Sequence, residues 1–244
     1  MPGPLDLALV VLFAAVWPLA EYFVFWPRHL RRVEAGDPLA RSSAYTRGLW
    51  EQWLLTAAVV GVMLYAGRSL DVIGLRLPTG WRLWLGLGLP LAYGMLAIAQ
   101  GRALATRPAS LAKLRARLTP LRALIPHTAA EYRLFMPLSV TAGICEELLF
   151  RGYLVWVLQH WLGQWPAAVT SMVIFGLAHM YQGRTFGVRA FFAGVAMGLL
   201  AIGTGSLLPG MALHALIDLI SGWITYMAMR EPAAGAGVVA EAAG

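Results

Sequence analysis

The chain has 244 residues, of which 59% are hydrophobic and only 13% are charged, and its formal net charge is +7. A soluble domain carries about 25% charged residues, so this composition excludes an ordinary soluble protein and indicates a polytopic membrane protein. We interpret the positive charge as a signal of membrane topology and expect no binding to nucleic acid. The single cysteine, Cys145, excludes an internal disulfide.

Apolar runs of spanning length predict about seven transmembrane helices, and the long third connection has room for an eighth. In chain order, we place the seven spans at residues 5–26, 48–67, 81–101, 134–156, 165–181, 188–204 and 208–229. The runs are too long and too uniformly apolar for the strands of a membrane barrel. We therefore predict an all-α, polytopic membrane helix bundle. One membrane-embedded domain, residues 1–231, would be followed by a disordered tail, residues 232–244.

Basic residues predict how the bundle is oriented. On one side of the predicted bundle lie the N-terminus and the second, fourth and sixth connections. This side carries only Arg68, Arg76 and Arg82. The other connections and the C-terminus hold Arg28, Arg31, Arg32, Arg41, Arg47, Arg102, Arg107, Lys113, Arg115, Arg117, Arg122, Arg133, Arg184, Arg189 and Arg230. Because cytoplasmic loops carry the excess of basic residues, we expect the N-terminus outside and the C-terminus in the cytoplasm.

Eighteen arginines against one lysine are typical of a GC-rich bacterial genome, so we expect an integral protein of a bacterial inner membrane, surrounded by its lipids.

Within the third connection, five apolar residues fall on one helical face with cationic residues between them: Leu111, Leu114, Leu118, Leu121 and Ile125. This pattern predicts a helix that lies on the anionic inner leaflet and is interrupted near Pro120. A solvated basic loop is the alternative.

Ionisable residues inside the predicted spans are the candidates for function, because a charge in hydrocarbon is costly. Glu147 and Arg151 are four residues apart and share a helical face, so we expect an ion pair between them. Glu146 then points about 100° around the helix and is free to act. Each of these groups has a structural alternative, since an intramembrane ion pair can serve packing alone.

Two further spans carry imidazoles. His179 lies one turn after Phe175, and His214 lies one turn before Asp218. If the three spans share a cavity, a glutamate could activate a water molecule, and the histidines could orient it or stabilise an oxyanion. These are the parts that peptide hydrolysis needs. A lone intramembrane histidine is more often a hydrogen-bonded packing residue, and the His214–Asp218 pair could be a polar contact between helices.

A count of depth along the predicted helices argues against a common position for Glu146, His179 and His214. Counting about 1.5 Å per residue from the predicted span ends puts Glu146 and His214 at similar heights. The same count puts His179 about 10 Å nearer the cytoplasm. We expect tilted helices or misplaced ends to account for the difference.

Three ordered motifs resemble those of a known family. They are Glu-Glu-Leu-Leu-Phe-Arg at residues 146–151, Phe175 with His179, and His214 with Asp218. They are similar to the Glu-Glu-x-x-x-Arg, Phe-x-x-x-His and His-x-x-x-Asn/Asp motifs of the CAAX protease and bacteriocin-processing (CPBP, or Abi) family. The resemblance covers residues 70–226. It implies an intramembrane endopeptidase with a catalytic core at about residues 130–226.

The resemblance also implies roles for the six residues. Glu146 would activate the water, and His179 would bind it or shuttle its proton. His214 and Asp218 would form the oxyanion-stabilising side, and Glu147 and Arg151 would support the geometry. Members were first described as metalloproteases, so zinc held by Glu146, His179 and His214 is an alternative. The chain has no His-Glu-x-x-His helix, and we prefer a mechanism without metal or other cofactor.

The substrate that we expect is a membrane-bound or lipid-attached peptide. The family also includes eukaryotic and archaeal enzymes that trim prenylated CAAX proteins, whereas bacterial relatives are linked to peptide maturation, bacteriocin immunity and membrane-protein cleavage. Two other classes remain: a non-catalytic immunity or scaffold protein that binds a peptide, and a transporter that uses the same groups as a proton relay. The sequence leaves the oligomeric state open.

Overall fold

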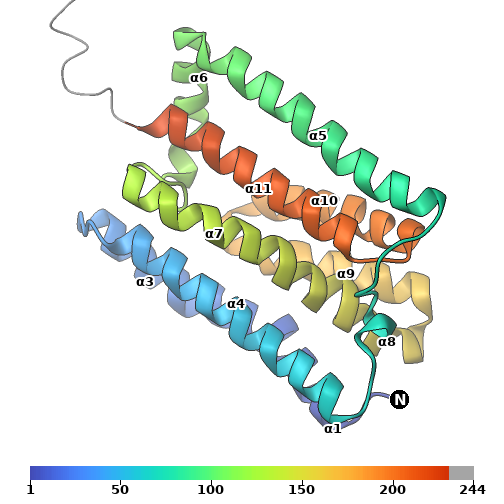
Figure 1. Cartoon of the computed structure of the whole chain (residues 1–244). Helices are drawn as coiled ribbons and strands as arrows, with labels where there is room; N and C mark the ends of the chain where they lie inside the picture. The colour runs from blue at the N-terminus through green and yellow to red at the C-terminus, as the bar shows by residue number, and fades with distance from the viewer. Residues whose placement is uncertain (231–244) are drawn as a thin grey trace, which may run out of the picture.

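The computed structural model describes residues 1–230, and within them every regular element is helical. The predicted all-α fold is confirmed. The predicted disordered tail, residues 232–244, lies outside the described residues. The helices pack side by side into one bundle, with the short α6 set across one end of it (Figure 1).

The described residues form eight continuous helices. The first combines α1 (Pro4–Val11), α2 (Trp17–Ala20) and α3 (Trp26–Glu34) through the π-helical turns Leu12–Val16 and Glu21–Phe25. The fifth combines α7 (Ala129–Glu146) and α8 (Val155–Leu162) through the π-helical segment Glu147–Leu154. The others are α4 (Ala40–Tyr65), α5 (Trp81–Ala105), α6 (Pro108–Leu118), α9 (Gln164–Ala178), α10 (Arg184–Thr204) and α11 (Leu208–Met229).

Each of the seven predicted spans coincides with a helix. Five of these helices are long and apolar enough to cross a membrane: Pro4–Glu34, Ala40–Tyr65, Trp81–Ala105, Arg184–Thr204 and Leu208–Met229. The α7–α8 helix is long enough, but Glu146, Glu147 and Arg151 lie in its middle and reduce its apolar character. Helix α9 has only 15 residues, fewer than the roughly 20 that span a bilayer upright.

The eighth helix, α6, lies in the third connection, where the sequence left room for one. It ends at Leu118 and is followed by a 3₁₀ turn, Thr119–Leu121, so the interruption predicted near Pro120 is confirmed. Its leucine face is half-buried in the molecule, and Arg115 donates from Nε to the carbonyl oxygen of Ala228 at 2.6 Å. This bond anchors α6 to the C-terminal end of α11.

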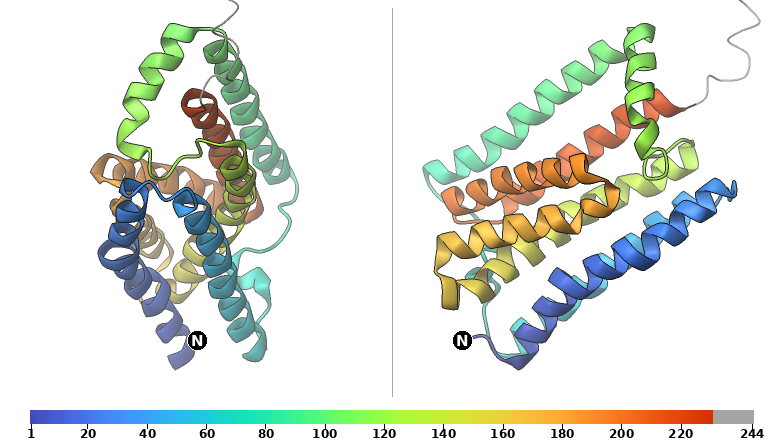
Figure 2. Two further views of the ribbon diagram at one scale, coloured as in Figure 1. Left: turned by 90° about the vertical axis from the view of Figure 1, so that its left-hand side faces the viewer. Right: turned by 180° about the vertical axis from the view of Figure 1, so that it is seen from behind.

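Local sequence explains where the site-bearing helices begin and turn. Thr128 and Glu131 form a capping box at the start of α7, with the Thr128 hydroxyl accepting from the Glu131 amide at 3.2 Å. Gly163 adopts a positive φ of 79° between α8 and α9, a conformation that favours glycine, and reverses the chain into a helical hairpin. Viewed from behind, α9 and α10 meet at a turn well short of the bundle end that carries α6 (Figure 2).

Candidate active site

Three helices bring the predicted residues together near the middle of the bundle. Glu146 ends α7, His179 directly follows α9, and His214 lies on α11. The Glu146 Oε2 atom is 3.8 Å from Nε2 of His179 and 3.9 Å from Nε2 of His214. Asp218 joins the cluster from α11, with its Oδ2 atom 3.7 Å from the same Nε2 of His214. The expectation that separate helices contribute to one cluster therefore holds.

Glu147 forms the buried ion pair that the four-residue spacing predicts. Its Oε1 atom accepts from Nη1 of Arg151 at 3.0 Å, and both side chains are almost fully buried. The same Oε1 atom accepts from Nδ1 of His214 at 2.9 Å. The latter bond links α7 to α11, and the sequence alone did not predict it. Gly210 of α11 lies close to this carboxylate, and a Cβ atom there would be 3.3 Å from Oε2 of Glu147.

Both imidazoles are held through Nδ1 and turn Nε2 towards Glu146. His179 Nδ1 lies 2.8 Å from the carbonyl oxygen of Phe175, and His214 Nδ1 lies 2.9 Å from the Glu147 carboxylate. Since a carbonyl or carboxylate oxygen can only accept, both Nδ1 atoms carry the proton. In the neutral rings, both Nε2 atoms therefore present a lone pair to the same side of Glu146.

Phe175 is the packing centre of the cluster. Its ring centroid lies 4.5 Å from that of His179 and 6.1 Å from that of His214. The Arg151 guanidinium stacks on the same ring, 3.8 Å from its centroid. A Cβ atom on Gly194 of α10 would come within 2.6 Å of Arg151 Nη2, so only glycine leaves room for the guanidinium there. Gly198, one turn further along α10, likewise lies against the Met172 side chain.

The depth count that separated His179 from the cluster is wrong, because it started from the wrong helix ends. The α8 helix runs on to Leu162, well beyond the predicted end at residue 156. Measured from the shared turn at Gly163, Glu146 lies 17 residues before it and His179 lies 16 residues after it. At 1.5 Å per residue the two arms reach about the same height, roughly 25 Å from the turn.

Helix α4 contributes a residue that sequence reasoning missed. Gln52 donates from Nε2 to Oε1 of Glu146 at 3.3 Å. Nearby, Arg47 binds Glu21 through both guanidinium nitrogens at 2.9 and 3.0 Å and also pairs with Glu51 at 3.1 Å. The available signal was the presence of Glu51 and Gln52 inside an otherwise apolar predicted span.

The other histidines and the cysteine lie outside the cluster. His29 Nε2 lies 2.8 Å from the carbonyl oxygen of Ala123, and His160 Nδ1 lies 2.8 Å from that of Trp156. Cys145 is fully buried. His127 lies in the loop before α7, where burial lowers the pKa of its imidazole. These residues stand apart from the hydrogen bonds of the cluster.

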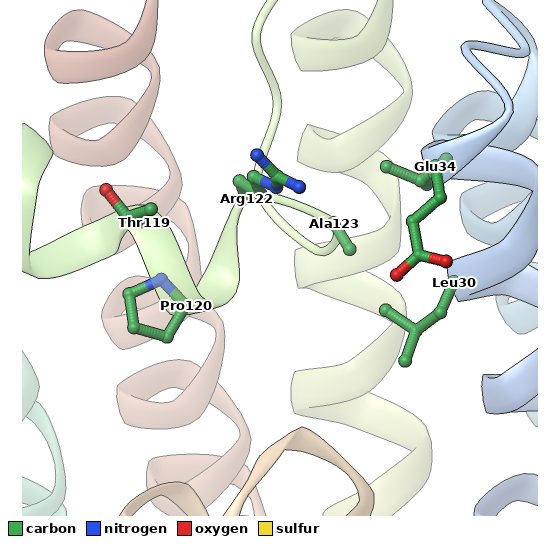
Figure 3. Close-up of a pocket in the computed structure, with 7 residues that line it drawn as sticks. Leu30, Glu34, Thr119, Pro120, Arg122 and Ala123 are labelled. Carbon is green, nitrogen blue, oxygen red and sulfur yellow. The ribbon is translucent and has the colours of Figure 1, made fainter.

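A surface cavity of about 380 Å³ lies between α3 and the turn after α6 (Figure 3). Leu30 and Glu34 line it from α3, and Pro120 and Arg122 line it from the turn. None of the six predicted residues lines this cavity. The candidate site therefore rests on the side-chain geometry of the cluster and not on the shape of this hollow.

A zinc ion would require a tighter arrangement than the one observed. Zinc bonds of 2.0–2.2 Å place the atoms of a tetrahedral ligand set about 3.4 Å apart. The Oε2–Nε2 separations of 3.8 and 3.9 Å are longer. Within residues 1–230, no group of three or more His, Cys, Asp or Glu side chains is spaced to hold a metal ion. Glu146, His179 and His214 would have to move by a few tenths of an ångström to hold zinc.

Comparison with protein-family models matches residues 128–220 to the family "Type II CAAX prenyl endopeptidase Rce1-like". The matched segment starts at the N-cap of α7 and ends within α11, and it contains all six predicted residues. The family resemblance read from the three motifs is confirmed over this segment. The comparisons with curated proteins and with solved structures gave no match.

Proposed function

We propose, on the premise that residues 128–220 belong to the Rce1-like family of CAAX endopeptidases, that the protein hydrolyses peptide bonds with a water molecule activated by Glu146. The family is one of intramembrane endopeptidases, and the helices are those of an integral membrane protein. The observation that carries the proposed mechanism is the position of Glu146 Oε2, 3.8 and 3.9 Å from the Nε2 atoms of two histidines.

These separations suit a bridging water. Each is longer than a direct hydrogen bond, and a water oxygen about 2.8 Å from each atom can lie between them. Glu146 Oε2 takes a proton from this water, and the water oxygen bonds to the carbonyl carbon of the substrate peptide. His179, held through Nδ1 by the Phe175 carbonyl, receives a water hydrogen at Nε2 and orients the molecule.

The tetrahedral intermediate then carries negative charge on the former carbonyl oxygen. We assign its stabilisation to the α11 side of the site, where His214 Nε2 lies between Glu146 and Asp218. A protonated His214 donates Nε2–H to this oxygen while Nδ1–H stays on Glu147. When the C–N bond breaks, the proton taken up by Glu146 passes to the leaving amine, and the products are a carboxylate and an amine.

Glu147 and Arg151 hold the catalytic side chains in position. Glu147 fixes the ring orientation of His214, and Arg151 balances the charge of Glu147 while stacking on Phe175. Because both members of this pair are buried, removing either would leave an uncompensated charge. Their proposed role is therefore to position the groups that contact the substrate.

The substrate that we propose is a membrane-bound or lipid-attached peptide. The cluster lies roughly 25 Å along the helices from the Gly163 turn, and this depth supports a site within a hydrocarbon core about 30 Å thick. A peptide must enter the apolar phase to reach it, and an attached lipid or apolar segment makes that entry favourable. We place the protein in a bacterial inner membrane with its C-terminus in the cytoplasm, because the basic connections lie on that side.

The direct test compares the wild type with Glu146→Gln in detergent. Probes are an internally quenched peptide with a farnesylated cysteine near its C-terminus, the same peptide without lipid, and an apolar transmembrane-type peptide. We expect cleavage of at least one lipidated or apolar probe, and a loss of roughly 10²–10⁴-fold in kcat/KM in the variant. Glu34→Gln, the same change at an exposed carboxylate on α3, should leave cleavage unchanged.

Three results would contradict the proposal. Equal cleavage by Glu146→Gln and wild type would remove Glu146 as the base. Activity that a chelator abolishes and added zinc restores would favour the metal alternative with Glu146, His179 and His214 as ligands. A protein that cleaves no probe but protects cells equally well with glutamate or glutamine at position 146 would instead be an immunity or scaffold protein.

A further inference from the structure

We infer that Gln52 of α4 is a positioning residue for Glu146, and that it directs the proton of the attacking water to Oε2. Gln52 lies outside the segment that matches the family model, and its side-chain amide donates to Glu146 Oε1 at 3.3 Å. This inference rests on the proposed function, because it assigns the orientation of the same general base.

The two oxygens of Glu146 have different surroundings. Oε1 meets the Gln52 amide, whereas Oε2 is buried and faces the two imidazole Nε2 atoms. One oxygen held by a donor fixes the plane of the carboxylate, so the other points at the proposed water site. Without the amide, the carboxylate could rotate about its terminal C–C bond and turn both oxygens out of line with the proposed water site.

The chemistry of the donor suits a base. Among the ion pairs of residues 1–230, none joins Glu146 to a lysine or arginine, because Arg151 pairs with Glu147. A charged donor would stabilise the ionised carboxylate strongly and weaken it as a proton acceptor. A neutral amide orients the group with a weaker bond. Gln52 therefore provides direction while leaving the carboxylate reactive.

Helix α4 is held in register against α7 by contacts next to Gln52. Trp53 donates from Nε1 to the Thr141 hydroxyl at 3.0 Å, and Thr56, one turn beyond Gln52, is buried in the same seam. On the other side, the neighbouring Glu51 is held by Arg47. Packing along the whole seam between α4 and α7 therefore sets the backbone from which the Gln52 amide reaches Glu146, and the loss of one bond beside it leaves that backbone in place.

The test uses Gln52→Leu, Gln52→Glu and Trp53→Phe, measured with a cleaved probe beside the wild type and Glu146→Gln. In Gln52→Leu, we expect kcat to fall roughly 10–100-fold with KM little changed, because ground-state binding is intact and the base is misoriented. The acid limb of its pH–rate profile should move to higher pH, since a donor to the ionised carboxylate is lost.

Gln52→Glu keeps the shape of the side chain and separates orientation from packing. Its carboxyl group can donate to Glu146 only when protonated, so its activity relative to wild type should recover as the pH falls. Trp53→Phe removes the neighbouring bond between α4 and α7 without touching Glu146. It should retain activity within a few-fold of wild type.

Wild-type kcat and pH profile in both Gln52 variants would overturn the inference and leave the proposed function standing. An equal loss in Trp53→Phe and Gln52→Leu would also overturn it, because packing of α4 would then explain the effect. Equal activity of Glu146→Gln and the wild type would overturn both this inference and the proposed function. If Gln52→Leu unfolds in detergent, Gln52→Glu decides by its opposite pH dependence.

Discussion

At the scale of single residues, two adjacent glutamates occupy opposite environments because a helix turns by about 100° per residue. Glu147 is fully buried between Arg151 and His214, whereas the Glu146 side chain keeps 16% of its surface exposed. The first carboxylate accepts from a guanidinium and an imidazole, both through its Oε1 atom. The second meets one neutral amide and the Nε2 atoms of two imidazoles, and within residues 1–230 it forms no ion pair with an arginine or lysine, which leaves it available as a base for water.

Glu147→Gln should destabilise the fold more than it perturbs the shape of the site. The amide leaves the Arg151 guanidinium buried without a counter-charge, a change that costs about 3–5 kcal/mol where it has been measured. Thermal unfolding in detergent should show a clearly lowered Tm. Asp37→Asn, which breaks the exposed pair with Arg32, is the control and should leave Tm unchanged. Equal Tm values for Glu147→Gln and wild type would contradict this account of the ion pair.

At the scale of elements, the site depends on how closely α10 approaches the α7–α9 hairpin. Gly194 faces the Arg151 guanidinium and Gly198 faces the Met172 side chain, so two glycines one turn apart let α10 pack tightly. Gly187 and Gly176 form a similar close contact nearer the turn between α9 and α10. Helix α10 supplies none of the six site residues, yet it confines Arg151 and Phe175.

Gly194→Ala should therefore impair catalysis through packing. Its Cβ atom would lie 2.6 Å from Arg151 Nη2, so the guanidinium must shift, and the bond from its Nη1 atom to Glu147 is weakened. We expect a loss of roughly 1–3 kcal/mol in stability and a fall in kcat. Gly203→Ala on the same helix has no atom within 4 Å of the added methyl group and is the matched control. Similar losses in the two variants would indicate a general effect of alanine in α10.

The helices and the ion pair were predictable from sequence, whereas the contacts between helices were not. Apolar runs located seven of the eight helices in residues 1–230, and the four-residue spacing predicted the bond between Glu147 and Arg151. Apolarity marks the hydrocarbon core but not the helix end, so the extension of α8 to Leu162 was missed. The bond from Gln52 to Glu146 depends on the register of α4 against α7, which no local pattern in either segment encodes.

At the scale of the whole molecule, aromatic residues mark a membrane–water interface at the end of the bundle that the proposed orientation puts outside the cell. Exposed tryptophans begin α5, at Trp81 and Trp84, and flank the Gly163 turn, at Trp161 and Trp165. Both groups lie at the end of the bundle away from α6, and tryptophan favours the membrane–water interface. The basic residues of α6 and its neighbouring loops lie at the opposite end.

Cysteine labelling can test this orientation. The native Cys145 is fully buried, so single exposed cysteines can be introduced into the otherwise wild-type chain. In intact spheroplasts, a membrane-impermeant maleimide should label Leu77→Cys and spare Lys113→Cys. Inverted vesicles should give the reverse pattern. Labelling of Lys113→Cys in intact cells would show that the bundle has the opposite orientation.

The hairpin around Gly163 has two arms, residues 146–162 and 164–179. Their lengths must match if Glu146 and His179 are to meet. Adding one residue to α9 would turn His179 by about 100° and carry it about 1.5 Å past Glu146, whereas many single substitutions would leave its height unchanged. An insertion could be tolerated only beyond Glu146 or His179, or with a compensating change on the other arm. Related chains that keep this chemistry should therefore conserve a residue count between the acidic pair and the first imidazole, even where the intervening side chains diverge.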